Sequence, residues 1–193
     1  MAPVKSDALR RVVLDAALAI SANAGPDALS LREVAREAGV SHQAPYHHFG
    51  DRAGIFAAIS EEGYAELSNA LLQSRTHGAT SMCEAYVHFA LQHKGHFRVM
   101  FRNDLCNVGN YPGALVQADR AFSILLDEVT TLLGKDASLN EAKAQATYMW
   151  SVAHGLATLL IDGPLEKKLG GIKDVNALIK QVAQLASASI HAR

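Results

Sequence analysis

The segment REAGVSHQAPYHHFGDR, residues Arg36 to Arg52, decides how the N-terminal part of this chain folds. A short helical pattern leads into it, Gly39 interrupts that pattern, and a second helical pattern follows over about 42–49. Glycine adopts a positive φ at little cost, so it commonly ends a helix or makes the turn between two helices. The segment therefore predicts two short helices joined by a tight turn, which is a helix-turn-helix.

The residues before this turn carry the signal of a helix start. Ser30 and Glu33 fit a capping box, in which the serine hydroxyl binds the Glu33 amide and the glutamate carboxylate reaches back. We therefore expect the first short helix over 31–38.

The second short helix and the helix after it have candidate caps of their own. Ser41 is the candidate for the helix over 42–49, and Asp51 is the candidate for a long helix over 52–75. Val40, between the two short helices, is expected to point back into the core. Its expected neighbours are the apolar side chains Ile20, Leu31 and Val34, with Phe49 closing the far end.

The rest of the chain repeats apolar residues at helical spacing and lacks strand signals. An apolar stripe predicts one helix before the turn segment, formed by Leu9, Val12, Val13, Ala16, Ala17 and Ile20. Gly25-Pro26-Asp27 is expected to end that helix. Five further helices are expected at about 82–93, 94–103, 114–134, 140–162 and 173–190, with loops at 107–113 and 165–171.

These patterns predict an all-α fold of about nine helices. The expected organisation is an N-terminal three-helix domain that contains the helix-turn-helix over 1–51, a connecting helix over 52–75, and a helical-bundle domain over 76–193. The segment 76–81 is the expected break between the domains.

Composition limits the class of protein. The chain has 193 residues, of which 49% are hydrophobic, so it can bury a core and is not expected to be disordered. No apolar run approaches the roughly 20 residues that a membrane-spanning helix needs. The two cysteines, Cys83 and Cys106, are too few for a disulfide framework and are interpreted as buried thiols. We expect a cytoplasmic protein.

The predicted second helix carries side chains that suit duplex DNA. Gln43 can pair in bidentate fashion with an adenine edge, and Ala44 can meet a thymine methyl group. His42 and His47 can donate to a base or a phosphate, and the phenol of Tyr46 can donate to a phosphate. In a helix-turn-helix the second helix protrudes, so its first residues can enter a major groove.

Two more side chains suit an anion, although the charges of this region cancel. Ser41 lies at a helix start, and Arg52 at the next helix start can hold a phosphate. Residues 1–52 contain six lysines and arginines and six aspartates and glutamates, and the whole chain has a formal net charge of -1. DNA binding would therefore depend on where the charges point. The alternative is a small helical subdomain with a polar surface.

The stretch LSLREVAREAGVSHQAPYHHFGDRAGIFAAI, Leu29 to Ile59, resembles the DNA-binding domain of the tetracycline-repressor (TetR) family of bacterial transcription regulators. The matching residues are Ala35, Gly39-Val40-Ser41, Tyr46, Phe49 and Arg52, the last at a position where the family often has lysine. Pro45 departs from the commoner threonine or leucine, so the helix start could be shifted by a residue.

The resemblance implies an all-α homodimer with an N-terminal reader of DNA and a C-terminal domain that senses a small molecule. It implies that the side chains lining the DNA are Ser41, His42, Gln43, Ala44, Tyr46, His47 and Arg52.

The C-terminal half contains a second resemblance. Trp150, His154 and Gly155 have the spacing of a TetR-type C-terminal domain named for these three residues, and HFRVMF at 96–101 is similar to a helix of that group. Trp150 and His154 are one helical turn apart and share a face. Gly155 would let a neighbouring helix approach closely.

This half is expected to form a mostly apolar effector site with few polar anchors. Its candidate residues are Phe97, Met100, Phe101, Tyr111, Phe122, Trp150 and His154. The alternative is that these residues form a core, with the His154 imidazole bonded to a backbone carbonyl. No cofactor is expected. No metal is expected either, because His93 and His96 lack the further ligands of a recognisable zinc site.

The last two predicted helices carry wide apolar faces, which suit pairing with their symmetry mates in a four-helix dimer interface. The alternative is that both faces are buried within one subunit. Together these observations predict a ligand-responsive transcriptional regulator, a homodimeric repressor that a small molecule releases from a pseudo-palindromic operator. The alternatives are a helical-bundle enzyme that uses His154 or a protein-binding adaptor that does not bind DNA.

Overall fold

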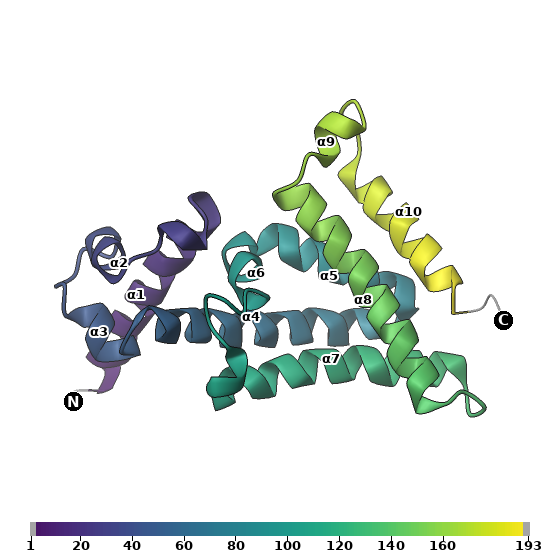
Figure 1. The fold of residues 1–193 in the computed structure, drawn as a ribbon, viewed down its shortest axis with the longest axis horizontal. Helices are drawn as coiled ribbons and strands as arrows, with labels where there is room; N and C mark the ends of the chain where they lie inside the picture. The colour runs from purple at the N-terminus through teal and green to yellow at the C-terminus, as the bar shows by residue number, and fades with distance from the viewer. Residues whose placement is uncertain (1–2, 191–193) are drawn as a thin grey trace. The chain divides into compact units, whose positions relative to one another are not determined.

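The computed structural model describes residues 3–190, and every regular element among them is helical (Figure 1). Ten α-helices occur in this part of the chain, and they confirm the predicted all-α fold. The chain forms two compact units. The first unit combines the residues up to Ala65 with His93–Ala118, and the second combines Glu66–Gln92 with the residues from Asp119 onward.

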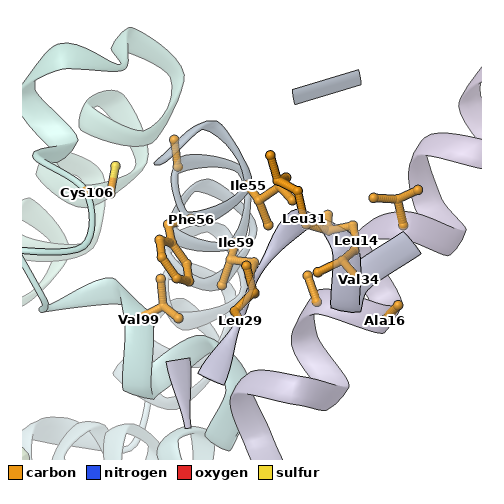
Figure 2. Packing of buried hydrophobic residues seen from close by; sticks show 13 residues of the cluster. Leu14, Ala16, Leu29, Leu31, Val34, Ile55, Phe56, Ile59, Val99 and Cys106 are labelled. Carbon is orange, nitrogen blue, oxygen red and sulfur yellow. The ribbon is translucent and has the colours of Figure 1, made fainter. Parts of the chain in front are cut away.

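The first unit is built around a core that α4 shares with the short N-terminal helices. Its elements are α1 (Pro3–Asn23), the 3₁₀ turn η1 (Pro26–Ala28), α2 (Leu31–Glu37), α3 (Ala44–Phe49), the first part of α4 (Arg52–Arg75), α6 (Lys94–Met100), the 3₁₀ turn η2 (Val108–Asn110) and the start of α7 (Pro112–Leu133). In Figure 2, Ile55 of α4 points toward Leu31 of α2, and Phe56 points toward Val99 of α6. Val40, Ile20 and Phe49 pack against this core, as predicted.

The turn between α2 and α3 has the predicted backbone. Gly39 has a φ of 65°, and the Val40 amide donates to the Ala35 carbonyl at 3.0 Å. The Ser30 hydroxyl accepts a hydrogen bond from the Glu33 amide at 3.2 Å, which is half of the predicted capping box. The other half is absent, because the Glu33 carboxylate accepts from the Arg36 guanidinium instead.

The predicted start of the third helix is wrong by two residues. The helix begins at Ala44 rather than at 42, and its cap is Gln43, which makes no side-chain capping bond. A Ser41 cap would have to bind the Ala44 amide, but that amide donates to the Ser41 carbonyl at 3.0 Å in a turn. Pro45, which has no amide hydrogen, falls in the first turn, where it is tolerated. Asp51 caps α4 as predicted, through the Gly54 amide at 2.8 Å.

The second unit is a helical bundle in which α5 packs against both α8 and α10. Its elements are the last part of α4, α5 (Gly78–Gln92), the part of α7 from Asp119, α8 (Leu139–Ile161), α9 (Leu165–Lys168) and α10 (Val175–Ala188). A full capping box of Ser138 and Glu141 starts α8, and Asp174 caps α10 through the Ala177 amide. Figure 1 shows α10 lying beside α8.

Several predicted boundaries need correction. Helix α5 begins at Gly78 rather than at 82, so the helix covers most of the predicted break over 76–81. Helix α6 ends at Met100 rather than at 103, and the four-residue α9 lies in the predicted loop over 165–171. The two compact units are defined by contacts between residues, and they do not test the predicted functional domains. The domains 1–51, 52–75 and 76–193 stay a prediction. Every helix among residues 3–190 is too short or too polar to span a bilayer.

We expect Gly39→Ala to lower the free energy of unfolding by about 1–2 kcal/mol, because alanine is strained at positive φ. Gly39→Asn should cost less, since asparagine tolerates this conformation better than other residues that carry a β-carbon. Urea denaturation of the two variants tests the expectation. An equal loss of unfolding free energy in the alanine and asparagine variants would contradict an origin in backbone strain at Gly39.

Candidate nucleic-acid interface and aromatic cluster

The tip of the helix-turn-helix faces outward. Gln43 and Tyr46, on which the DNA-reading interpretation depends, are both exposed, and the Tyr46 side chain is 56% exposed. Ser41, His42 and His47 are exposed as well. Five of the seven predicted DNA-binding side chains therefore lie on an accessible surface, although their contact with DNA stays a prediction.

The other two predicted side chains are engaged within the protein. Ala44 is only 6% exposed, so little of its methyl group is available to a thymine. The Arg52 guanidinium donates to the carbonyl oxygens of Pro26 and Asp27 at 2.9 and 3.3 Å, and it lies over the Phe56 ring. The structure therefore gives Arg52 an internal role that its position in the sequence did not indicate.

Several arginines of the N-terminal helices are paired with carboxylates. Arg11 pairs with Asp15 and Glu62, and Arg36 pairs with Glu33 and Glu37. These pairs leave two arginines of α1 and α2 with no carboxylate partner among residues 3–190. The first, Arg32, is exposed on α2. The second, Arg10, is exposed on α1 and lies 4.9 Å from the centre of the Phe49 ring of α3.

The junction between α1 and α2 is held by arginines from α6 and from the turn that follows it. Arg98 of α6 donates to the Ala22 carbonyl at 2.5 Å, and Arg102 pairs with the Asp27 carboxylate at 3.3 Å. Gly95 permits the approach of α6 to α1, since a β-carbon there would lie 2.6 Å from the Leu18 carbonyl oxygen. Together with Arg52, these contacts fasten the junction to α4 and α6.

Tyr86, Trp150 and His154 form a hydrogen-bonded cluster in the second unit. The Trp150 Nε1 donates to the Tyr86 hydroxyl at 3.2 Å, and that hydroxyl lies 2.9 Å from His154 Nδ1. The Phe122 ring packs against Trp150 with a centroid separation of 6.0 Å. Three residues of the predicted effector site are therefore grouped here, together with Tyr86, which the sequence analysis did not identify.

Burial lowers the pKa of His154 below its ordinary value. The imidazole is therefore neutral at pH 7. Tyr86 is 6% exposed, whereas Trp150 is 37% exposed and forms the accessible edge of the cluster.

The remaining predicted effector residues belong to the first unit. Phe97 and Met100 are buried, and Phe101 packs edge-on against both Phe97 and Tyr64, with centroid separations of 5.6 Å. The Tyr64 hydroxyl donates to the Met100 carbonyl at 2.8 Å. Tyr111 is half-buried against the core of this unit. Effector binding by these four residues stays a prediction.

Histidines 93 and 96 do not complete a metal site within residues 3–190, where no three metal-ligating side chains are grouped. Instead, His96 Nε2 lies 3.0 Å from the Glu62 carboxylate, which also binds Arg11. Burial lowers the pKa of His96, and Glu62 partly opposes that shift.

The exposed face of α8 is uncharged over four turns. Between Lys143 and Asp162 its exposed side chains are Ala144, Thr147, Tyr148, Trp150, Ser151, Thr158 and Leu159. Gly155 lies near the middle of this stretch. The prediction that it admits a neighbouring helix is wrong for this chain by itself, since a β-carbon there would meet nothing within 4 Å.

Tyr86 escaped the sequence analysis because its partners lie 64 and 68 residues further along the chain. No local spacing connects such positions. The α8 capping box, in contrast, was readable as Ser138-Leu139-Asn140-Glu141 and was missed.

Comparisons with known proteins agree with this architecture. Residues 13–59 match the family model described as bacterial regulatory proteins, tetR family, and residues 79–184 match the model described as tetracyclin repressor-like, C-terminal domain. No curated protein matches the chain.

Solved structures share the whole fold. A protein of unknown function from Rhodococcus sp. RHA1 is 29% identical, with 94% of this chain and 93% of that chain covered and a TM-score of 0.73. A bacterial regulatory protein in the tetR family from Rhodococcus RHA1 is 17% identical, with coverage of 94% and 96% and a TM-score of 0.71. The fatty acid degradation regulator FadR from Bacillus halodurans is 14% identical, with coverage of 96% and 97% and a TM-score of 0.67.

The lowered pKa of His154 predicts that acid destabilises the fold. The unfolded chain takes up the proton near pH 6.5, above the pKa in the folded state, so stability is lost as pH falls below about 6.5. One proton contributes at most about 1.4 kcal/mol per pH unit. His154→Gln should reduce the slope of unfolding free energy against pH, as measured by denaturation at several pH values. An unchanged slope would contradict the expectation.

Proposed function

Since this chain belongs to the TetR family of bacterial regulatory proteins, we propose that it is a homodimeric repressor that a small molecule releases from a pseudo-palindromic operator. The observation that carries the proposal is the outward-facing tip of the helix-turn-helix, where Gln43 and Tyr46 are exposed.

The proposed readers of the bases come from the start of α3 and the turn before it. Gln43 can bind an adenine edge in bidentate fashion, and His42 and His47 can donate to bases or phosphates. Ser41 and Tyr46 would add contacts to the DNA backbone. We leave Ala44 and Arg52 out of the proposed contact set, because one is buried and the other binds backbone carbonyls.

Arg10 and Arg32 are the proposed phosphate contacts. Affinity for DNA rests largely on cations that neutralise phosphates, and a cation already paired with a carboxylate contributes little. Arg11 and Arg36 are paired in this way, whereas Arg10 and Arg32 belong to helices that pack on α3 and have no carboxylate partner among residues 3–190. The zero net charge of residues 1–52 is thus compatible with DNA binding.

The uncharged face of α8 supports a dimer. The cores of protein interfaces are depleted of charged residues, and this face has no exposed charge between Lys143 and Asp162. Gly155 makes the helix less stable than alanine would, by about 1 kcal/mol, and no neighbour in the described part of the chain requires it. We therefore place the approach of a second copy at Ser151 and Gly155, with Leu185 of α10, which is 74% exposed, at the side.

Two such subunits would present two copies of α3 to successive major grooves, about 34–36 Å apart. An effector bound in the C-terminal domain would act by changing that separation through α4, which continues from the core beneath the reader into the second unit. A coupling free energy of about 1–3 kcal/mol would be enough to change operator affinity 5- to 150-fold.

A helical-bundle enzyme that uses His154 would not need an exposed Gln43 and Tyr46, whereas a protein-binding adaptor could use the same helix without binding DNA. A gel shift with the DNA upstream of the protein's own gene separates these classes from a repressor. Gln43→Ala with Tyr46→Phe should weaken binding and relax sequence preference. Unchanged affinity and preference would contradict the proposed reading helix.

Arg32→Ala should weaken operator binding for all sequences alike. Each dimer would lose two phosphate contacts, so the slope of log affinity against log salt concentration should become shallower by about 2. Fluorescence anisotropy with labelled operator over a range of salt concentrations measures this slope.

The matched control for Arg32 is the double variant Glu33→Gln, Arg36→Gln, which deletes an ion pair of the same helix without changing net charge. Its salt slope should equal that of the original protein. A shallower slope for the double variant, or no change for Arg32→Ala, would contradict the assignment of charges.

Gly155→Leu should convert the dimer to a monomer. A β-carbon at this position meets nothing within 4 Å among the described residues, so the monomer should keep its helical content, whereas the leucine would block close approach of a second α8. Sedimentation velocity and circular dichroism measure the two properties. A dimer of unchanged affinity would show that α8 does not pair at this position.

A further inference from the structure

From the histidines at the tip of the helix-turn-helix we infer that this protein takes up protons from solution when it binds DNA, so that its affinity for the operator rises as pH falls from about 8 to about 6. This inference rests on the proposed DNA-binding function, and it specifies how that same site is regulated. The reader would gain positive charge from protons rather than from further lysines or arginines.

The tip of the reader has histidines where it lacks fixed charges. Residues 38–50 contain no lysine, arginine, aspartate or glutamate, but they contain three of the nine histidines of the chain, namely His42, His47 and His48. Histidine is the side chain whose charge ordinarily changes between pH 5 and 8. The charge that this segment can offer to DNA therefore depends on its histidines.

Two of these histidines lie on the outward side of the reader. His47 follows Gln43 by one helical turn, and its amide donates to the Gln43 carbonyl at 2.9 Å, so the two side chains share a face. His42 lies in the turn that precedes α3 and is exposed as well. The other side of α3 carries the buried residues Ala44 and Pro45. Both histidines therefore belong to the surface that carries Gln43, the proposed reader of an adenine.

The third histidine has a different environment. His48 is half-buried, and its ring packs edge-on against the rings of His47 and Phe49, with centroid separations of 5.3 and 6.4 Å. Its Nε2 is enclosed by the protein and has no hydrogen-bond partner among the described residues. That nitrogen cannot reach a phosphate. We therefore assign the proton uptake to His42 and His47.

The carboxylates around α3 are engaged with other groups. Helices α1 and α2 pack against α3, and α4 follows it. From residue 6 onward, the charged and titratable side chains of these elements near α3 are Asp7, Arg10, Arg11 and Asp15 of α1, Arg32, Glu33, Arg36 and Glu37 of α2, Tyr46 and His48 of α3, and Asp51 and Arg52 at the start of α4.

Neither His42 nor His47 forms an ion pair with one of these carboxylates in the described part of the chain. Asp15, Glu33 and Glu37 pair with arginines, and Asp51 accepts from a backbone amide. A phosphate would therefore be the anion that pairs with the two imidazoles.

Duplex DNA supplies the negative charge that would hold the protons. It carries one charge per about 1.7 Å of its axis, and an anion beside an imidazole favours the protonated form. Residues 1–52 contain six basic and six acidic side chains, so one proton on each of the two histidines would raise the net charge of this region from zero to +2. That gain would double the cationic contribution of Arg10 and Arg32, the two proposed phosphate contacts.

The pH dependence of DNA binding tests the inference. The full-length protein is titrated into a fluorescently labelled duplex from the region upstream of its own gene, at constant ionic strength, at about pH 8 and about pH 6. Affinity should be at least about tenfold higher at the lower pH, because binding that takes up protons is favoured by acid. The slope of log affinity against log salt concentration should also be steeper there, since more phosphates are neutralised. Circular dichroism and sedimentation velocity at both pH values establish that the fold and the oligomeric state are the same.

Two double variants separate the charge of the histidines from their shape. His42→Gln with His47→Gln should reduce the ratio of the affinities at the two pH values to less than about threefold, because glutamine takes up no proton. His42→Lys with His47→Lys should bind tightly at both pH values, because lysine carries its charge throughout this range.

The matched control is His77→Gln, which removes an exposed histidine from the second unit. The ratio of affinities in this variant should equal that of the original protein.

The inference is overturned by equal affinities at the two pH values, by a pH dependence that persists in either double variant, or by an equal loss of pH dependence in His77→Gln. A protein that binds the duplex but gives one of these results would keep the proposed repressor function and lose the proposed proton uptake. A lack of binding at both pH values would contradict the repressor function itself, and the inference with it.

Discussion

The reader of this protein depends on one contact, the burial of the first turns of α4 beneath α1 and α2. Ile55, Phe56 and Ile59 are almost inaccessible to solvent and are packed in a single apolar cluster with residues of both helices. Because that cluster takes the apolar sides of the short helices, the polar tip formed by Gln43 and Tyr46 is turned outward. The surface available to DNA is a consequence of the core, since α3 by itself has only six residues and would not be stable in isolation.

The distribution of arginines follows from the same packing. Some arginines form ion pairs at the surface, as Arg36 does with Glu33. Others hold the α1–α2 junction by binding carbonyl or carboxylate oxygens, namely Arg52, Arg98 and Arg102. Few arginines of this region are therefore available to bind a phosphate. A chain whose net charge is close to zero can therefore still present a local positive surface, since its carboxylates pair with some arginines and leave others unpaired.

The second unit combines an apolar interior with polar groups, among them the cluster of Tyr86, Trp150 and His154 and the ion pair of Arg75 with Glu128. The α5–α8 contact places Tyr86 beside Trp150 and His154, and α7 adds Phe122. The outer face of α8 is exposed and carries no charged side chain between Lys143 and Asp162. One helix thus carries two surfaces of different chemistry, and both depend on its long, regular course from Leu139 to Ile161.

Local chemistry in the sequence determined the helix-turn-helix, the αL turn at Gly39, the Asp51 cap and the position of α4, because caps and glycine turns act within a few residues. It also indicated that Trp150 and His154 share a face, which follows from helical spacing. Only the tertiary structure decided that Ala44 is buried, that Arg52 binds backbone carbonyls and that Tyr86 joins Trp150 and His154. Those outcomes depend on contacts between residues far apart in the chain, and no periodicity or short motif records which distant partner will occupy a given side chain.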